Sequence, residues 1–424
     1  MTLQRLISAI VTKAAVLSYC AVAFAENGGR MNGEALSESA DEITTQIAEL
    51  DESREDQSFY GPFETGFENW ENLWDSVESA SGLNLVFAYT TLFQTTSIGA
   101  TPGMRSGGAG DLDILGRWKL IDEVNAIEWL NEGILGFNFE YRHRIGANTP
   151  SDVGLVSGSL WNTATGFNEQ EFAPIQYWWQ QKLFQNRFMV RIGKLDPSSI
   201  FDSYRFNSSN FFFVNQAFAD NPTIPFPDNG WGVVGAWYPD DNWFLLFGST
   251  NADGRKVETS TTLDQDIDAW FSAATGGWRG PVGNLGEGLY QITLWHSDPK
   301  TNSTRPGATG FSIVAQQELG NQWVPYLRYA RSSAAATDTE QLFTIGAVLE
   351  DPFGQNGDRL GVSGGWGSPF DRTLRSQGVG EIFYRFEPFP EFQITPSFQF
   401  TSNPSRDPSQ SLIGIFGIRG RINF

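Results

Sequence analysis

Apolar and polar residues alternate along much of this chain, and the alternation is clearest at the C-terminus. Counting back in twos from Phe424 gives a face of apolar residues and glycines, and the opposite face is polar. The first face comprises Leu412, Gly414, Phe416, Ile418, Gly420, Ile422 and Phe424, and the second comprises Gly417, Arg419, Arg421 and Asn423. Because successive side chains of a strand point to opposite sides, one side of this strand suits hydrocarbon and the other suits water. The segment alone leaves two structures open, a membrane barrel and a soluble β-sandwich.

The same alternation occurs inside the chain, in residues 136–145 and 381–387. One face of each segment is aromatic or aliphatic, and the other is charged or amide-bearing. These faces are Phe137, Phe139 and Tyr141 against Asn138, Glu140, Arg142 and Arg144, and Ile382, Tyr384 and Phe386 against Glu381, Arg385 and Glu387. An Arg on a lipid-facing surface near the membrane midplane costs roughly 2–4 kcal/mol. We therefore expect the charged faces to line a water-filled lumen.

Fifteen segments after residue 83 have the pattern of strands separated by turns. They are residues 83–94, 111–120, 133–145, 175–183, 188–195, 231–238, 243–250, 287–296, 310–319, 323–331, 341–349, 359–366, 378–386, 392–401 and 412–424. A further strand at 154–161 would give the even number that bacterial membrane barrels have.

The connections between these segments differ in length. Those at 184–187 and 239–242 are short, whereas those at 197–230 and 251–286 are long. Short turns on one side and long loops on the other are typical of outer-membrane barrels. An open sheet edge would leave backbone groups unpaired in lipid. The sequence therefore predicts an all-β fold, a transmembrane antiparallel β-barrel of about 16 strands, with a short N-terminal periplasmic helix.

Residues 1–25 have the pattern of a secretory signal peptide. Arg5 and Lys13 are basic, an apolar stretch covers residues 14–24, and Ala23-Phe24-Ala25 forms a small-x-small cleavage site. Cys20, the only cysteine, lies in this segment, so we expect a mature chain without disulfides or thiolate ligands. After residue 25 no run approaches the ~18–20 apolar residues of a spanning helix.

The composition agrees with a barrel that divides its side chains between lipid and lumen. Aromatic residues make up 14% of the chain, with 34 Phe, 15 Trp and 45 Gly, yet no long apolar run occurs. The formal net charge is −21, so no basic surface is available to neutralise phosphates and a nucleic-acid partner is not expected. Part of the charge is local, because residues 26–60 hold ten acids and only two arginines.

Within this acidic leader, residues 26–58, apolar or small residues recur at spacings of four, three, four and three. They are Leu36, Ala40, Ile43, Ile47 and Leu50. This spacing is that of a heptad seam, although two heptads are too short to form a stable helix alone. We predict a periplasmic helix that joins a short coiled coil in a homotrimer; a helix lying on the barrel, or disorder, is the alternative. An aromatic connecting segment, residues 59–82, leads to the barrel, residues 83–424.

A group of motifs in the middle and C-terminal parts of the chain resembles one known family. They are Gly193-Lys194-Leu195-Asp196-Pro197, Phe201-Asp202, Phe211-Phe212-Phe213-Val214-Asn215, Asn221-Pro222, Gly230-Trp231-Gly232, Trp237-Tyr238-Pro239, Tyr384-Arg385-Phe386 and Asn403-Pro404. From about residue 83 to 424 the chain resembles the carbohydrate-selective outer-membrane porins of the OprB type. The resemblance implies a 16-stranded barrel whose narrow, charged constriction passes mono- and oligosaccharides passively. The terminal aromatic strand also resembles the signal that the barrel assembly machinery reads.

Charged residues on the lumen-facing phases of the strands are the candidates for the substrate pathway. They are Glu140, Arg142, Arg144, Arg191, Lys194, Arg328 and Arg385. Charged groups of both signs suit neutral sugars, because they bind hydroxyls tightly enough to admit a sugar and weakly enough to release it. For each residue a position elsewhere on the lumen wall is an equal alternative, and Lys194 with Asp196 also suits the ordering of the following loop.

Residues for other chemistry are scarce. His143 and His296 lie in different predicted strands, and no phosphate-binding loop, dinucleotide fingerprint or nucleophile elbow occurs. Asp264, Asp266 and Asp268 could suggest a glycosidase acid and base, but they lie in a long polar connection that we expect to be a solvated loop. We therefore expect no enzyme activity, no cofactor and no metal site.

Together these features predict an outer-membrane porin of a Gram-negative bacterium that passes carbohydrates. The expected partners are small-molecule sugars, outer-membrane lipids and lipopolysaccharide, which acidic groups could bridge through divalent ions, and the barrel assembly machinery. Two alternatives remain: a porin of the same fold for other small solutes, such as organic acids or cations, and a secreted β-rich carbohydrate-binding protein or glycosidase.

Overall fold

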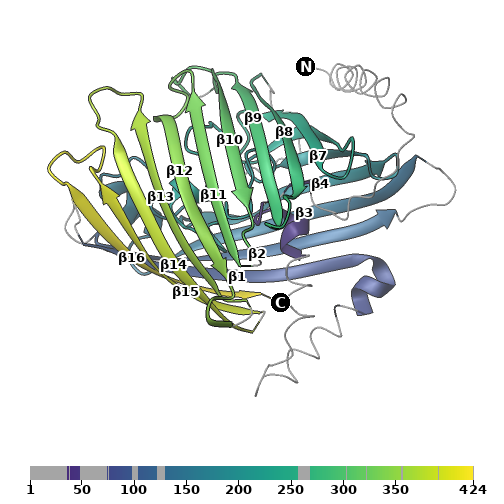
Figure 1. Ribbon diagram of the computed structural model, residues 1–424, viewed down its shortest axis with the longest axis horizontal. Coiled ribbons are helices and arrows are strands. Elements are labelled where there is room, and N and C mark those ends of the chain that lie inside the picture. The colour runs from purple at the N-terminus through teal and green to yellow at the C-terminus, as the bar shows by residue number, and fades with distance from the viewer. Residues whose placement is uncertain are drawn as a thin grey trace.

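The computed structural model describes residues 36–37, 39–47, 74, 76–97, 104–121, 129–255, 268–301, 303–320, 322–354, 357–389 and 391–423. The predicted signal peptide, residues 1–25, lies outside these residues, as do Leu50 and most of the connecting segment 59–82. In the described part, the chain forms a closed barrel of sixteen antiparallel strands (Figure 1).

Each strand pairs with its neighbours in the sequence, and the first strand also pairs with the last. The strands are β1 (Leu83–Thr96), β2 (Ser106–Ile121), β3 (Leu130–Ile145), β4 (Gln170–Leu183), β5 (Phe188–Leu195), β6 (Gly230–Trp237), β7 (Trp243–Asn251), β8 (Trp270–Pro281), β9 (Glu287–Ser297), β10 (Ala308–Gln317), β11 (Trp323–Ser332), β12 (Thr339–Glu350), β13 (Arg359–Pro369), β14 (Gln377–Phe389), β15 (Phe392–Ser402) and β16 (Leu412–Asn423). Pairing of β1 with β16, from Ala88 with Asn423 to Thr96 with Ile415, closes the barrel. Closure leaves no sheet edge in the membrane.

The predicted division between lipid and lumen is confirmed in the strands where it was clearest. On β16, Phe416 is 47% exposed on the outer surface, whereas Arg419 and Arg421 are each 2% exposed and face the interior. On β3, Asn138 and Glu140 face inward and Tyr141 faces outward. The outer surface of the barrel is therefore apolar, and the charged side chains are placed in the lumen.

The turns at one end of the barrel are short and those at the other end are longer. The turn between β4 and β5 reverses the chain through Phe184, Gln185 and Asn186, which all have positive φ. At the opposite end, longer segments connect β3 to β4 and β5 to β6. Because bacterial barrels keep short turns on the periplasmic side, the long loops mark the extracellular end.

The position predicted for the hidden strand was wrong, although the total of about sixteen strands is correct. Residues 154–161 are not a strand; they belong to helix α4 (Pro150–Val156) and the turns after it. The missing strand is β8, which lies in the connection predicted to be a long loop. Its outward positions include Ser272, Ala274 and Gly276, and these small residues hide the alternation that identified the other strands.

Loops rather than strands fill the interior. The segment between β3 and β4 brings α4 against β1 and β2, and α4 begins with a capping box in which Thr149 and Asp152 exchange hydrogen bonds. The connection between β5 and β6, residues 196–229, folds into the barrel and contains the short helix α5 (Gln216–Ala219). We call it the inward loop. A one-turn 3₁₀ helix η2 (Pro352–Gly354) lies at the short-turn end. Among the described residues, no helix has both the length and the apolar character to cross a membrane.

Part of the acidic leader also lies inside the barrel. Residues 43–47 are helical, and Leu36, Ala40, Ile43 and Ile47 are all buried. Leu36, Ile43 and Ile47 pack in one apolar cluster with Trp178 of β4 and Leu195 of β5. Figure 1 shows this purple segment between the two walls of the barrel. The four described positions of the predicted seam therefore pack against the chain's own barrel.

Candidate functional site

The inward loop begins at a strained glycine at the end of β5. Gly193 has φ +151°, and a Cβ atom there would lie 2.3 Å from the carbonyl oxygen of Tyr177. Only glycine lets β5 approach β4 this closely. Three residues further on, Asp196 accepts hydrogen bonds from the backbone N and the Oγ of Ser198, at 2.9 and 2.6 Å. The motif Gly193–Pro197 thus turns the chain from the wall into the lumen.

Arg328 of β11 holds one part of the inward loop. Its Nη1 lies 3.6 Å from the carboxylate of Asp202, and its Nη2 donates to the carbonyl oxygens of Ala217 and Asp220 at 2.6 and 2.5 Å. Asp202 also accepts a 2.5 Å hydrogen bond from Asn221. The loop therefore folds around one buried guanidinium.

A second attachment involves the wall strands β14 and β16. Glu381 accepts hydrogen bonds from the backbone N of Val214 at 2.9 Å and of Asn215 at 3.0 Å. Arg419 donates to the carbonyl oxygens of Ser209 and Phe212 at 2.6 and 2.8 Å. These contacts satisfy backbone groups of an irregular segment that no strand ladder can pair.

Arginines also stack on the aromatic residues of this loop. The guanidinium carbon of Arg421 lies 4.3 Å from the ring centroid of Phe211, and that of Arg385 lies 5.5 Å from the ring of Phe212. Such cation–π contacts are worth ~0.5–2 kcal/mol, depending on desolvation. The phenylalanine run predicted as a family motif is thus the part of the loop that rests on the arginines of the wall.

Beside the inward loop lies a cavity of about 750 Å³, the inner cavity. Its lining comes from β2, β3, β4, the segment before β4, the inward loop, the N-terminal leader and the segment after β7. Its charged residues are Asp41, Asp113, Glu140, Arg142, Glu169, Asp196, Asp220, Asp228 and Arg255. Seven carboxylates therefore face two arginines across this part of the lumen.

The centre of the inner cavity contains a compact charged group on β2 and β3. Asp113 and Glu140 lie directly opposite each other in the ladder, as do Asp111 and Arg142. Arg142 Nη2 lies 2.5 Å from Glu140 and its Nε lies 3.4 Å from Asp111. Carboxylate oxygens of Asp111, Asp113 and Glu140 approach within 4.8 Å of one another, a spacing that could hold a metal ion. Arg142 already supplies positive charge there.

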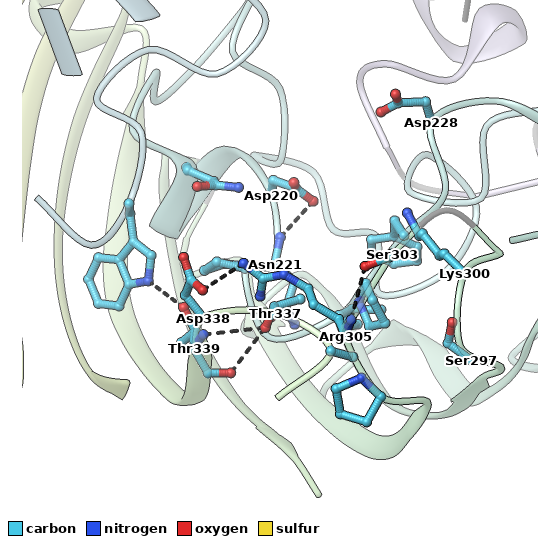
Figure 2. A pocket seen from close by; sticks show the side chains of 18 of the residues that line it. Asp220, Asn221, Asp228, Ser297, Lys300, Ser303, Arg305, Thr337, Asp338 and Thr339 are labelled. Carbon is cyan, nitrogen blue, oxygen red and sulfur yellow. Dashed lines mark hydrogen bonds and ion pairs between the residues drawn. The ribbon is translucent and has the colours of Figure 1, made fainter. Parts of the chain in front are cut away.

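A second cavity of about 440 Å³, the outer cavity, lies among the long loops (Figure 2). In it Arg305 pairs with Asp338 at 2.7 Å, and the buried indole of Trp161 donates to the Oγ1 of Thr339 at 3.0 Å. Asp220, Phe226 and Asp228 line both cavities, so the two adjoin at the end of the inward loop. The same end of the inward loop therefore lines both cavities.

Asp220 lies where the two cavities adjoin, and its environment alters its protonation. Burial raises the pKa of its carboxyl, with smaller contributions in the same direction from Asp196 and Asp202. The hydrogen bond from the backbone of Asn221 and the charge of Arg328 oppose this rise. Asp220 therefore takes up a proton at a higher pH than a free aspartate does.

The seven residues predicted for the substrate pathway occupy different surroundings. Glu140 and Arg142 line the inner cavity. Arg144 lies at the rim of the barrel, half-exposed and 3.7 Å from Glu169. Lys194 is buried, with Nζ 3.4 Å from the carbonyl oxygen of Pro174.

The other three predicted residues hold interior segments. Arg191 pairs with Glu42 of the leader at 2.8 Å, and Arg328 holds the inward loop through Asp202. Arg385 lies 3.4 Å from Glu387 and stacks on Phe212.

Sequence reasoning missed several residues that line the cavities. Asp113 lies on the polar phase of β2, opposite Glu140, so pairing the two strands would have found it. Asp220 and Asp228 lie in a loop with no periodicity, and no sequence signal places them in the lumen. Asp41 and Gln46 belong to the leader, which was expected outside the barrel.

A closed antiparallel barrel with a lipid-facing apolar surface and a polar lumen narrowed by an inward loop defines an outer-membrane porin. Residues 125–424 match the family model of carbohydrate-selective porins, the OprB family. The chain belongs to this family, and it is a porin for carbohydrates in the outer membrane of a Gram-negative bacterium.

Individual relatives are distant in sequence. Porin AaxA of Chlamydia pneumoniae is 21% identical over 323 residues, which cover 72% of this chain and 70% of that protein. Porin AaxA of Chlamydia abortus is 19% identical over 316 residues, covering 72% and 68%. The high-pH structure of Pseudomonas putida OprB has a TM-score of 0.69 at 13% identity, and covers 84% of this chain and 97% of that one. At this identity the structural likeness shows a shared fold.

Proposed function

We propose that mono- and oligosaccharides diffuse passively along the lumen of this porin, through the outer cavity, past the inward loop and into the inner cavity. The observation that supports the proposal best is the inner cavity itself, where Glu140 and Arg142 present charges of both signs beside the inward loop. A sugar has hydroxyls that carboxylates and guanidinium groups can hydrogen-bond. Contacts of this kind can exchange with water, as conduction requires.

The charged groups of the pathway suit binding and release better than catalysis. Glu140 pairs with Arg142 and also accepts a 2.5 Å hydrogen bond from Gln170. A glycosidase needs a carboxylic acid and a carboxylate on either side of the scissile bond. Glu140 and Arg142 form an ion pair whose groups can hydrogen-bond a passing sugar, so the pair supports a channel better than a glycosidase.

The excess of carboxylates supports a charge preference as well. Seven carboxylates and two arginines line the inner cavity. Negative charge in a narrow lumen repels anions and attracts cations. The channel should therefore admit neutral and cationic solutes more readily than anionic ones of the same size.

Reconstitution of the purified protein tests this function. Swelling of proteoliposomes in neutral mono- and oligosaccharides should be rapid, and swelling in a sugar phosphate should be slower. Glu140→Gln should reduce the discrimination against the anion, whereas the matched control Asp371→Asn, at a fully exposed loop position, should not. Ion conductance without sugar flux would contradict the carbohydrate pathway. An absence of both ion conductance and sugar flux would contradict the channel function.

Secretion, assembly and oligomeric state belong to the same proposal. Residues 1–25 would direct export, and the terminal Phe424 would be read by the barrel assembly machinery. Deleting Phe424 should reduce the amount of heat-modifiable, folded protein in the outer membrane. A homotrimer stays a prediction that would depend on contacts between barrel walls, and native mass spectrometry in mild detergent measures it.

A further inference from the structure

The described part of the acidic leader, residues 36–37 and 39–47, lies in the lumen. Leu36, Ile43 and Ile47 are 3%, 1% and 0% exposed, although a two-heptad helix in water would expose most of such a seam. They share one apolar cluster with Ile200 and Phe201 of the inward loop. The leader is thus packed between the wall and the inward loop.

Polar contacts fix the same segment on several sides. Glu42 pairs with Arg191 of β5, and both side chains are buried. Asp41 accepts a 2.6 Å hydrogen bond from Ser208 of the inward loop. Arg421 of β16 donates to the side chain of Gln46 at 3.3 Å. These contacts connect the leader to two distant parts of the wall and to the loop between them.

The Arg191 contact is the most enclosed of these. The guanidinium of Arg191 also donates two hydrogen bonds to the side chain of Gln180, at 3.0 and 2.7 Å. It lies 3.7 Å from the ring centroid of Trp178. Among the residues that the structure describes, the Glu42 carboxylate supplies the one negative charge paired with this guanidinium. A buried guanidinium needs such a counter-charge, and here the leader supplies it to a residue of the barrel wall.

One face of the leader remains open to the pathway. Asp41 and Gln46 are only partly buried and line the inner cavity, the same cavity that Glu140 and Arg142 line. The buried side of the leader therefore takes up space in the lumen. Its open side presents the Asp41 carboxylate and the Gln46 amide to the inner cavity.

We propose that residues 36–47 form a plug that lines the pore, sets its width and adds the Asp41 carboxylate to the groups that select solutes. The proposal rests on the proposed channel function. It assigns to the leader a part in permeation in addition to any part in assembly.

Cysteine modification tests the proposal with the backbone intact. The only natural cysteine, Cys20, lies in the proposed signal peptide, so Asp41→Cys would introduce the single thiol of the mature chain. A cationic methanethiosulfonate reagent should react with it in the folded protein and reduce the single-channel current. An anionic reagent of similar size should react more slowly. Asp371→Cys, at an exposed loop position, should be modified without a change in current.

A deletion tests the effect on pore width. Removing residues 26–47 should raise single-channel conductance and the permeation of longer oligosaccharides, whereas removing only 26–35 should leave both unchanged. If the protein with the larger deletion fails to fold, the reactivity of Asp41→Cys and its effect on the current decide whether residues 36–47 plug the pore. An Asp41→Cys thiol that is inert in the folded protein, or that reacts without altering the current, would overturn the plug.

The wild-type protein separates this proposal from the channel function. A wild-type channel that conducts sugars, with an inert Asp41→Cys thiol, would contradict the plug alone. A wild-type protein that does not conduct would contradict the channel function. Equal conductance of a folded protein with and without residues 36–47 would also overturn the plug.

Discussion

Two groups of barrel strands, β2 with β3 and β11 with β16, carry charged residues with different contacts. On β2 and β3, Asp113, Glu140 and Arg142 face the inner cavity. On β11 and β16, Arg328 and Arg419 are each about as buried and donate to backbone carbonyls of the inward loop. The charges of the first group lie at a cavity surface, and those of the second group hold a loop in place. A charged residue on the lumen-facing phase of a strand is therefore not by itself a pathway residue.

The largest effect should follow from removing an anchoring arginine. Arg328→Ala would leave the buried Asp202 carboxylate without its cation and two loop carbonyls without their donor. Breaking a buried ion pair in this way costs about 3–5 kcal/mol. We expect a lower temperature of barrel unfolding in heat-modifiability assays and noisier single-channel currents.

Arg144→Ala is the matched control, because Arg144 lies half-exposed at the rim. A surface pair of this kind contributes roughly 0–1 kcal/mol, so stability should hardly change. If Arg144→Ala destabilised the barrel as much as Arg328→Ala does, the proposed anchoring role of Arg328 would be wrong.

The next effect concerns permeation rather than stability. Arg142→Gln should increase the preference for cations and alter sugar flux, because it removes one of the two arginines that line the inner cavity in the described part of the chain. Reversal potentials in a salt gradient and sugar-induced noise measure these changes. Arg385→Gln on β14 is the comparison, where we expect the inward loop to loosen and selectivity to shift less. Equal shifts in selectivity would show that Arg142 and Arg385 both serve the pathway.

A smaller effect should appear with pH. The raised pKa of Asp220 means that lowering the pH protonates this carboxyl before a free aspartate would be protonated. The preference for cations should therefore begin to fall at a pH above the pKa of an ordinary aspartate, and Asp220→Asn should reduce that change. A profile that is the same in the variant and the wild type would assign the titration to other carboxylates.

The smallest effect should come from the outer cavity. Trp161→Phe removes the indole hydrogen bond to Thr339 but keeps an aromatic ring in the same buried place. One such hydrogen bond contributes about 1 kcal/mol. We expect a slight fall in unfolding temperature and nearly unchanged conductance. A large loss of sugar flux would instead show that Trp161 contacts the sugar.

Secondary structure was largely predictable from the sequence, and the two wrong predictions have local causes. Alternation identifies strands such as β3, β14 and β16 because one face has to meet lipid. It fails at β8, where serine, alanine and glycine face outward beside Trp278. It also suggested a strand at 154–161, where the chain turns inward after the capping box at Thr149.

The candidate site was predictable only in part. The phase of β3 correctly placed Glu140 and Arg142 toward the lumen, but the same argument applied equally to Arg191 and Arg328, which hold interior segments. The partners of these arginines, Glu42 and Asp202, are far away in the sequence. No spacing rule connects them.

The sequence by itself determined that this chain is a lipid-facing barrel with a charged lumen, because a period of two allows one face to meet hydrocarbon and the other water. It also contained the leader's apolar heptad pattern, but not the surface on which those side chains pack. Only the tertiary structure decided that the inward loop and residues 36–47 fill the lumen. Burial of a loop or a short helix depends on contacts between distant residues, such as Glu42 with Arg191, which no local pattern encodes.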